Sequence, residues 1–307
     1  MIDEPLVTIG VPTFNRPESL SITLKSIINQ TYSNLEIIIS DNCSTNPEVQ
    51  KIIEEFATKD HRITTYSQSS NLGAIGNLNF VLSKASGNYF IWAADDDEWQ
   101  GKDFLALLVK YAHENILTFP DAATFDDPEL CLLTSYENCK SKLDYVKTFC
   151  SMGWGYPFYG LYNLNLFNQH NLKFEFDTDL AYYSEGTFLH KLFLTGPAKY
   201  VKEAKILYTP NGSLPSNEIL IDNFVTYFKR TLLIYASADL PQKDRFELLN
   251  RVFKTYTVHI SGLFEDFISF DRLATTENKM ALVKKKNAAE KILFRIKRAT
   301  TVLVKGN

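Results

Sequence analysis

The first hundred residues alternate between two hydrophobic patterns. Short apolar runs rich in β-branched and aromatic residues predict four strands, at residues 7–11, 35–40, 62–67 and 89–94. Between them, apolar residues recur every three or four positions and predict three helices, at residues 17–30, 47–58 and 73–85. Alternation of this kind is typical of an α/β fold in which helices cover both faces of a mainly parallel sheet.

The pattern becomes less regular after residue 100. It predicts a helix at 103–114, a further strand and a helix within 131–151, a helix at 185–194 and a strand at 200–208. From about residue 216 onward the pattern is helical throughout. We therefore place a domain boundary after residue 213.

Polar clusters directly follow three of the predicted strands. They are Thr13 to Arg16, Asp41 to Thr45 and Asp95 to Asp97. In parallel sheets, ligands bind beyond the carboxyl ends of the strands. We therefore predict a ligand site where these three clusters meet.

Asp95, Asp96 and Asp97 put three negative charges at the end of a buried strand. Like charges a few ångströms apart cost free energy unless a cation neutralises them. Mg²⁺ and Mn²⁺ prefer such oxygen ligands and typically bridge to substrate phosphates. The triplet predicts a divalent-metal site and a phosphorylated substrate. The structural alternative is a solvated turn that caps the following helix.

Composition narrows the class of protein. The chain has 307 residues, of which 45% are apolar and 22% charged, so it can bury a large core. The net charge of −4 gives no reason to expect nucleic acid as a partner. The four cysteines lack C-x-x-C spacing, which argues against a zinc site and favours reduced thiols in a cytoplasmic protein. We expect neither a signal peptide nor a transmembrane helix.

Four motifs occur in a fixed order along the chain. They are Val11-Pro12-Thr13-Phe14-Asn15-Arg16, Ser40-Asp41-Asn42-Cys43-Ser44-Thr45, Asn71-Leu72-Gly73 and Asp95-Asp96-Asp97. Over roughly residues 5–213 they resemble family-2 glycosyltransferases of the GT-A fold. The resemblance implies a mainly parallel central sheet flanked by helices. It further implies a catalytic domain at 1–213, with a nucleotide-binding part (1–100) and an acceptor-binding part (101–213). A helical C-terminal region with a basic amphipathic end follows at 214–307.

The resemblance also implies which residues bind a nucleoside-diphosphate sugar. Asp96 and Asp97 would hold Mg²⁺ or Mn²⁺, with Asp96 at the family's metal-ligand position, and Asp95 would contact the ribose. Asp41 would read the base, and a carboxylate that accepts from an imide N–H favours UDP or dTDP. The alternative for Asp41 is an Asx-turn at the end of a strand. The other implied donor-binding residues are Pro12, Thr13, Phe14, Asn15, Arg16, Asn71, Gly73 and Asn77.

Two positions depart from the family pattern. Ala94 stands where the first carboxylate of the acidic motif often lies. We therefore expect Asp96 to be the most important metal ligand of the cluster. Ile75-Gly76-Asn77 replaces the Ala-Arg-Asn of many relatives. Any contact made by that arginine must therefore come from elsewhere in this chain.

Glu185 matches the acid that serves as general base in the family. It lies at the start of a predicted helix, after an aromatic stretch, and replaces the more frequent Asp. A base of this kind takes the proton from the acceptor hydroxyl, and a helix N-terminus is expected to lower its pKa. Asp177 and Asp179 are the alternatives, and an ordinary acid at a helix start is the structural reading.

Two further stretches each allow a functional and a structural interpretation. Trp154, Tyr156, Phe158 and Tyr159 form either a platform for the acceptor sugar or part of the core. Residues 279–305 contain nine basic residues and one acid, Glu290. A helix with this composition either lies on an anionic membrane surface, at the inner face of the membrane, or packs on the domain with a solvated basic face.

The sequence thus predicts a metal-dependent, inverting glycosyltransferase. It would move a sugar from a nucleoside-diphosphate sugar to a hydroxyl of a glycan or lipid-linked acceptor, in cell-surface polysaccharide synthesis. A non-catalytic relative that binds sugar nucleotides as a partner subunit stays open. A sugar-nucleotide pyrophosphorylase would also use a similar sheet, but its Gly-rich loop is missing after the first strand.

Overall fold

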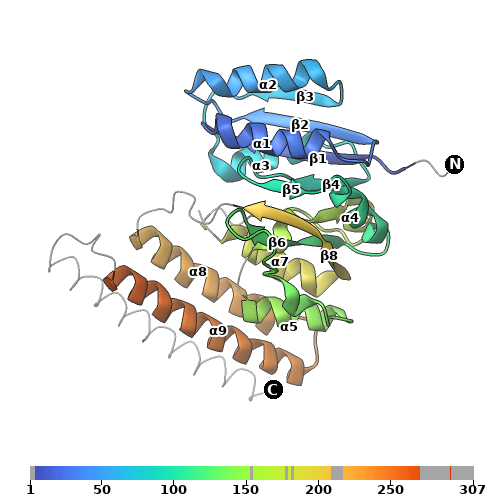
Figure 1. Cartoon of the computed structure of the whole chain (residues 1–307). Coiled ribbons are helices and arrows are strands. Elements are labelled where there is room, and N and C mark those ends of the chain that lie inside the picture. The colour runs from blue at the N-terminus through green and yellow to red at the C-terminus, as the bar shows by residue number, and fades with distance from the viewer. Residues whose placement is uncertain are drawn as a thin grey trace. The chain divides into compact units, whose positions relative to one another are not determined.

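The computed structural model describes residues 4–152, 155–176, 179–180, 183–208, 217–269 and 291 (Figure 1). The chain divides into two compact units. The first unit is Met1–Lys142, Tyr156–Phe176 and Thr195–Ser213, and the second is Leu143–Gly155, Asp177–Leu194 and Leu214–Asn307. These units differ from the predicted domain limits, because two segments before residue 213 group with the C-terminal part. The functional division at residue 213 stays a prediction.

The described part of the first unit contains one eight-stranded sheet, in the order β3-β2-β1-β4-β7-β6-β8-β5. Its parallel half consists of β1 (Val7–Thr13), β2 (Leu35–Asp41), β3 (Ile63–Ser67) and β4 (Tyr89–Trp92). Thr13 lies opposite Asp41 in the register of β1 and β2. The predicted polar clusters therefore follow neighbouring strands at one edge of the sheet, and the α/β prediction is confirmed.

The other half of the sheet is mixed. It consists of β5 (Glu98–Gln100), β6 (Leu117–Thr124), β7 (Leu161–Asn163) and β8 (Ala198–Tyr208). Strand β7 is antiparallel to both β4 and β6, whereas β8 is parallel to β6 and antiparallel to β5.

Two expectations about this region need correction. Strand β6 was not predicted, because it contains Pro120 and Asp121, which are rare in strands, and its register shifts between them. The strand predicted within residues 131–151 is wrong. That segment is described in full and forms a 3₁₀ turn, Thr134–Tyr136, and helix α5 (Lys142–Met152).

Helices cover both faces of the parallel half. They are α1 (Pro17–Ile28), α2 (Pro47–Lys59) and α3 (Gly73–Ser83). Helix α4 (Phe104–Ala112) contacts β6, β7 and β8 of the mixed half, and a short α6 (Leu164–Gln169) follows β7. The apolar faces of α1, α2 and α4 share one core with Ile9 of β1. Gly10 points to the other face, where a Cβ would meet Val81 of α3 at 2.8 Å. Gly10 therefore permits the close packing of α3 on β1.

The second unit is helical in its described part. It contains α5, α7 (Ser184–Thr195), α8 (Asn217–Ala236) and α9 (Gln242–Ser269), and α8 and α9 lie side by side (Figure 1). Its core is unusually rich in tyrosine, with Tyr227, Tyr235 and Tyr256 buried. None of the helices described is both long and apolar enough to cross a membrane.

Several predicted features lie outside the described residues. These are Trp154, Asp177 and the basic segment 279–305, of which only the exposed Lys291 is described.

Candidate functional site

The loops after β1 and β4 meet around the Asp95 carboxylate. Thr13 Oγ1 donates to Asp95 Oδ2 at 2.8 Å, and the backbone N–H of Phe14 donates to the same oxygen at 3.2 Å. Arg16 Nη1 lies 3.1 Å from Asp95 Oδ1. The structure thus brings together four of the residues predicted to bind the donor. Burial raises the pKa of Asp95, although Arg16 and Thr13 act in the opposite direction.

Asp96 and Asp97 differ in how their charges are balanced. Arg16 Nη1 lies 2.5 Å from Asp96 Oδ2, at the partly exposed rim of the site. The Asp97 side chain is buried, and no hydrogen bond to its carboxylate is found among the described residues. Burial, together with the charges of Asp96 and Asp95, raises the pKa of Asp97 well above its usual range. The Arg16 guanidinium acts in the opposite direction but does not offset these effects, so ionising Asp97 is costly.

This donor set fits a hard divalent cation. Asp95 and Asp96 share the Arg16 guanidinium, and Thr23 Oγ1 fixes the turn by donating to the backbone oxygen of Asp97 at 2.6 Å. The described residues include no group of three His, Cys, Asp or Glu side chains arranged to hold a metal ion. Mg²⁺ is commonly bound by only one or two carboxylates, the rest of its shell being water and substrate phosphate. One or two of these carboxylates could therefore contribute to such a shell.

Asp41, at the end of β2, was expected either to contact the nucleotide base or to form an Asx-turn. Its Oδ1 accepts from the backbone N–H of Ser44 at 3.1 Å, which is the Asx-turn considered as the alternative. No hydrogen bond to its Oδ2 is found in the part of the chain that is described. The turn uses one carboxylate oxygen, and the other is available for a base.

Asn15 joins the loops after β1 and β2. It has a left-handed φ of 56°, which asparagine tolerates better than most residues. Its backbone N–H donates to Ser44 Oγ at 2.9 Å, and its Oδ1 accepts from the N–H groups of Thr45 and Asn46 at 2.8 and 3.0 Å. Pro12 lies one step earlier, within β1 and opposite Ser40. Asn15 therefore holds the loop after β1 against the loop after β2, and both loops form the site.

Asn42 was not among the predicted site residues, yet it ties the third loop to β2. It is buried, its Oδ1 accepts from the N–H of Leu72 at 2.8 Å, and its Nδ2 donates to Asn71 Oδ1 at 3.0 Å. Gly73 follows with a left-handed φ of 73° and an open position at its Cβ. The signal was present in the motif after Asp41, where an asparagine next to a strand end often makes such turns.

Asn77 is placed differently from Asn71 and Gly73. It is buried, its Oδ1 accepts from Ser40 Oγ at 2.6 Å, and its Nδ2 donates to the Ser40 carbonyl at 2.9 Å. These bonds engage both polar ends of the side chain in supporting β2. A contact between Asn77 and the nucleotide stays a prediction that this geometry does not favour.

Two apolar side chains on these loops are exposed. Phe14 is 39% exposed and Leu72 is 43% exposed. Phe14 is thus not a core residue, which agrees with a role beside a nucleotide base. Phe158, in contrast, is 1% exposed and stacks on Trp92 with ring centroids 4.6 Å apart. Phe158 belongs to the core and not to an acceptor platform.

Glu185 lies in the second unit, in the first turn of α7. It is half-buried, and the described residues provide no cation beside it. The expectation that the helix N-terminus lowers its pKa is wrong, because desolvation outweighs the helix and raises the pKa. The alternative Asp179 is exposed and pairs with Arg230 at 3.3 Å.

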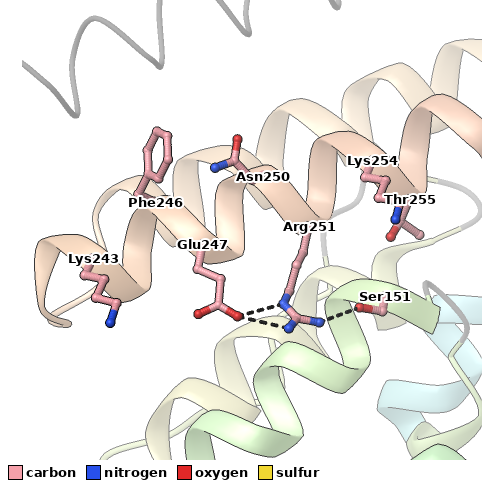
Figure 2. Close-up of a pocket in the computed structure, with 8 residues that line it drawn as sticks. All are labelled: Ser151, Lys243, Phe246, Glu247, Asn250, Arg251, Lys254 and Thr255. Carbon is pink, nitrogen blue, oxygen red and sulfur yellow. Dashed lines mark hydrogen bonds and ion pairs between the residues drawn. The ribbon is translucent and has the colours of Figure 1, made fainter.

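The second unit also contains a groove of about 850 Å³ along α9 (Figure 2). Its lining residues are Ser151, Lys243, Phe246, Glu247, Asn250, Arg251, Lys254 and Thr255. Glu247 and Arg251 pair at 2.9 Å and point toward Ser151 of α5, whereas Phe246 and Asn250 point away from it. The central charges of the groove therefore compensate each other.

Comparisons with known proteins agree with this geometry. The family described as "Glycosyl transferase family 2" matches residues 8–129, a range that includes all three polar clusters. The chain is 40% identical over 100 residues to the putative colanic acid biosynthesis glycosyl transferase WcaA of Escherichia coli K12, covering 32% of this chain and 35% of the relative. It is 36% identical over 114 residues to the GalNAc(5)-diNAcBac-PP-undecaprenol beta-1,3-glucosyltransferase of Campylobacter jejuni, covering 36% and 37%.

The chain thus spans about a third of the length of these curated relatives. Similarity in fold extends further. A crystal structure of S. aureus TarS 1–349 in complex with UDP-GlcNAc superposes with a TM-score of 0.68 at 17% identity, covering 92% of this chain and 81% of that one. Residues 8–129, with the polar motifs in their order, are thus similar to glycosyl transferase family 2, and the fold of the chain matches that of GT-A glycosyltransferases such as TarS.

Proposed function

We propose that this protein is a metal-dependent, inverting glycosyltransferase of cell-surface polysaccharide synthesis. It transfers a sugar from a nucleoside-diphosphate sugar to a hydroxyl of a glycan or lipid-linked acceptor. The observation that carries the proposal is the acidic cluster at the carboxyl edge of parallel strands, where the nearby Arg16 does not offset the burial of Asp97 and the repulsion from Asp95 and Asp96. The names of the relatives support the same class of reaction.

The donor is proposed to bind across the loops after β1, β2 and β4. Asp96 and Asp97 would hold Mg²⁺ or Mn²⁺, which when bound neutralises charge on the diphosphate leaving group. Asp95, fixed by Thr13 and the N–H of Phe14, is placed to accept from a ribose hydroxyl. Arg16 adds a cation beside the same carboxylates.

The base of the nucleotide is proposed to lie near Asp41 and Phe14. The free oxygen of Asp41 can accept from the imide N–H of uracil or thymine, and the exposed ring of Phe14 offers an apolar face. This supports UDP- or dTDP-sugars over GDP-sugars. The TarS complex, whose ligand is UDP-GlcNAc, agrees with a uridine nucleotide.

Glu185 is proposed to be the general base. Its desolvated carboxylate has a raised pKa, which makes it a stronger base than an exposed glutamate. Glu185 would take the proton from the acceptor hydroxyl as its oxygen attacks the anomeric carbon. Because the attack comes from the side opposite the leaving nucleoside diphosphate, the configuration at that carbon is inverted. The undecaprenol-linked substrate in the name of the C. jejuni relative supports a lipid-linked acceptor.

The direct experiment is a panel of UDP-, dTDP- and GDP-sugars incubated with the full chain and Mn²⁺. We expect release of nucleoside diphosphate from a UDP- or dTDP-sugar, and at least a 100-fold loss of this rate in Glu185→Gln. Preference for GDP-sugars would contradict the role of Asp41. Binding of a sugar nucleotide without turnover, unchanged by Glu185→Gln, would support the non-catalytic alternative.

Location at the inner face of the membrane is a separate proposal. It rests on the nine basic residues of segment 279–305. Flotation with phosphatidylglycerol vesicles tests it, and the expected binding should be lost at high salt. Equal recovery with neutral phosphatidylcholine vesicles would contradict it.

A further inference from the structure

The turn before α7 is strained. Tyr183 has a φ of 79°, in the left-handed region that a bulky aromatic residue rarely adopts. Its carbonyl oxygen accepts from the N–H groups of Gly186 at 3.1 Å and Thr187 at 3.3 Å, so the turn closes around Glu185. Strain of this kind persists only where the surrounding structure holds it, and it is concentrated at functional sites.

Tyr227 of α8 contacts this turn on both sides of Glu185. Its ring stacks on Tyr183, with centroids 5.3 Å apart and an interplanar angle of 11°. It also lies against Gly186, where an added Cβ would meet the Tyr227 hydroxyl oxygen at 2.5 Å and two ring carbons at 2.8 Å. Any side chain at residue 186 would therefore displace either the turn or the ring.

His190, one turn further along α7, fixes the hydroxyl of the same tyrosine. The imidazole is fully buried, its Nε2 lies 3.1 Å from the Tyr227 hydroxyl, and its Nδ1 pairs with the Tyr235 hydroxyl. Burial lowers the pKa of His190 to about 3, so the ring is neutral at physiological pH. A neutral imidazole donates from one nitrogen and accepts at the other, which ties the two tyrosines into one network.

We infer that Tyr227 is a positioning residue for Glu185. Its ring holds the strained turn through Tyr183 and Gly186, and its hydroxyl is anchored to α7 through His190. This inference rests on the proposed function, in which Glu185 is the base. Displacing a catalytic group by about 1 Å can lower a rate about 100-fold, so the orientation of this turn matters for the reaction.

The experiment compares three variants of the full chain. Tyr227→Phe removes the hydroxyl and keeps the stack, whereas Tyr227→Leu removes both. Tyr235→Phe is the matched control, because it also deletes a hydroxyl bonded to His190, whereas no ring contact or hydrogen bond joins Tyr235 to the described residues 183–187. The readouts are kcat and KM for the sugar nucleotide that the panel turns over fastest, with thermal unfolding measured in parallel.

We expect kcat to fall about fivefold in Tyr227→Phe and about 100-fold in Tyr227→Leu, with KM for the donor within twofold of the wild type. Tyr235→Phe should lose stability as Tyr227→Phe does and keep kcat within twofold. A purely structural role predicts equal kcat losses in Tyr227→Phe and Tyr235→Phe, and that result would overturn the inference.

Amide hydrogen exchange separates this inference from the proposed function. Tyr227→Leu should speed exchange at residues 183–187 at least tenfold more than Tyr235→Phe does. If no sugar nucleotide is turned over, the proposed function fails while exchange still tests whether Tyr227 holds the turn. Unchanged exchange at 183–187 in Tyr227→Leu would refute the positioning role.

Discussion

The two units hold their key carboxylates in opposite surroundings. In the first unit, Asp95 and Asp96 pair with Arg16, and Asp97 follows them in the same turn after β4. In the second, Glu185 stands apart from any cation among the described residues, at a turn held by aromatic rings. Burial is the largest cause of the raised pKa of Asp95 and Asp97 as well as of Glu185, but only in the first unit do neighbouring carboxylates raise the pKa further. The first creates a demand for added positive charge, and the second makes a single carboxylate more basic.

The largest effect is expected from Asp97→Asn. Loss of a metal ligand should lower kcat/KM about 1,000-fold, since metal stabilisation of a leaving group amounts to several kcal/mol. The same change should raise the thermal stability of the metal-free protein, because it removes a buried charge that repels two neighbours.

The sign of this stability change depends on pH. The folded state holds a proton on Asp97 more tightly than the unfolded state does, because its pKa is raised. The metal-free wild type should therefore lose stability as pH rises above about 4, and Asp97→Asn should lose less. Parallel pH curves for the two proteins in EDTA would contradict this account of Asp97.

Glu185→Gln is expected to have the next largest effect. Removing a general base should lower kcat about 100- to 1,000-fold while leaving the binding of nucleoside diphosphate unchanged. Asp179→Asn is the matched control, since that acid is exposed and paired with Arg230. A larger loss of kcat in Asp179→Asn than in Glu185→Gln would reassign the base.

The pH profile of kcat tests the surroundings of Glu185. The carboxylate must be ionised to accept a proton, so kcat should fall as pH drops through its pKa. Burial raises that pKa, which places the acid limb above the ordinary glutamate value of about 4.3. A limb at or below that value would indicate a solvated carboxylate and contradict the proposed desolvation.

Asp41→Asn should have a moderate effect confined to the donor. The asparagine Oδ1 can still accept from the N–H of Ser44, so the turn is kept while the carboxylate charge is lost. We expect KM for UDP- or dTDP-sugars to rise about tenfold, as one hydrogen bond to a charged group is worth about 1.5–3 kcal/mol. An unchanged KM would restrict Asp41 to the Asx-turn.

The smallest effect is expected from Asn42→Ala. It leaves the N–H of Leu72 and the side chain of Asn71 without their partner. The free energy of unfolding should fall by about 1–3 kcal/mol, measured by urea denaturation. Asn71→Ala, at an exposed position, should cost less, and the reverse order would contradict the role given to Asn42.

The sequence predicted the parallel half of the sheet well because its strands are apolar and its helices strongly periodic. It did not predict β6, where Pro120 and Asp121 conceal a buried strand. The contacts of Thr13 and Arg16 with Asp95 follow from motifs at the ends of neighbouring strands. The pKa of Glu185 could not be predicted, because it depends on burial at a turn whose partner, Tyr227, lies more than forty residues away.

The central claim is that the acidic cluster binds a divalent cation together with a nucleoside diphosphate. Calorimetric titration of the full chain with UDP, dTDP and GDP, each with Mn²⁺ and with EDTA, tests it directly. We predict that UDP or dTDP binds at least tenfold more tightly with Mn²⁺, and that Asp97→Asn removes this difference. Equal affinity for every nucleotide in Mn²⁺ and in EDTA would contradict the claim.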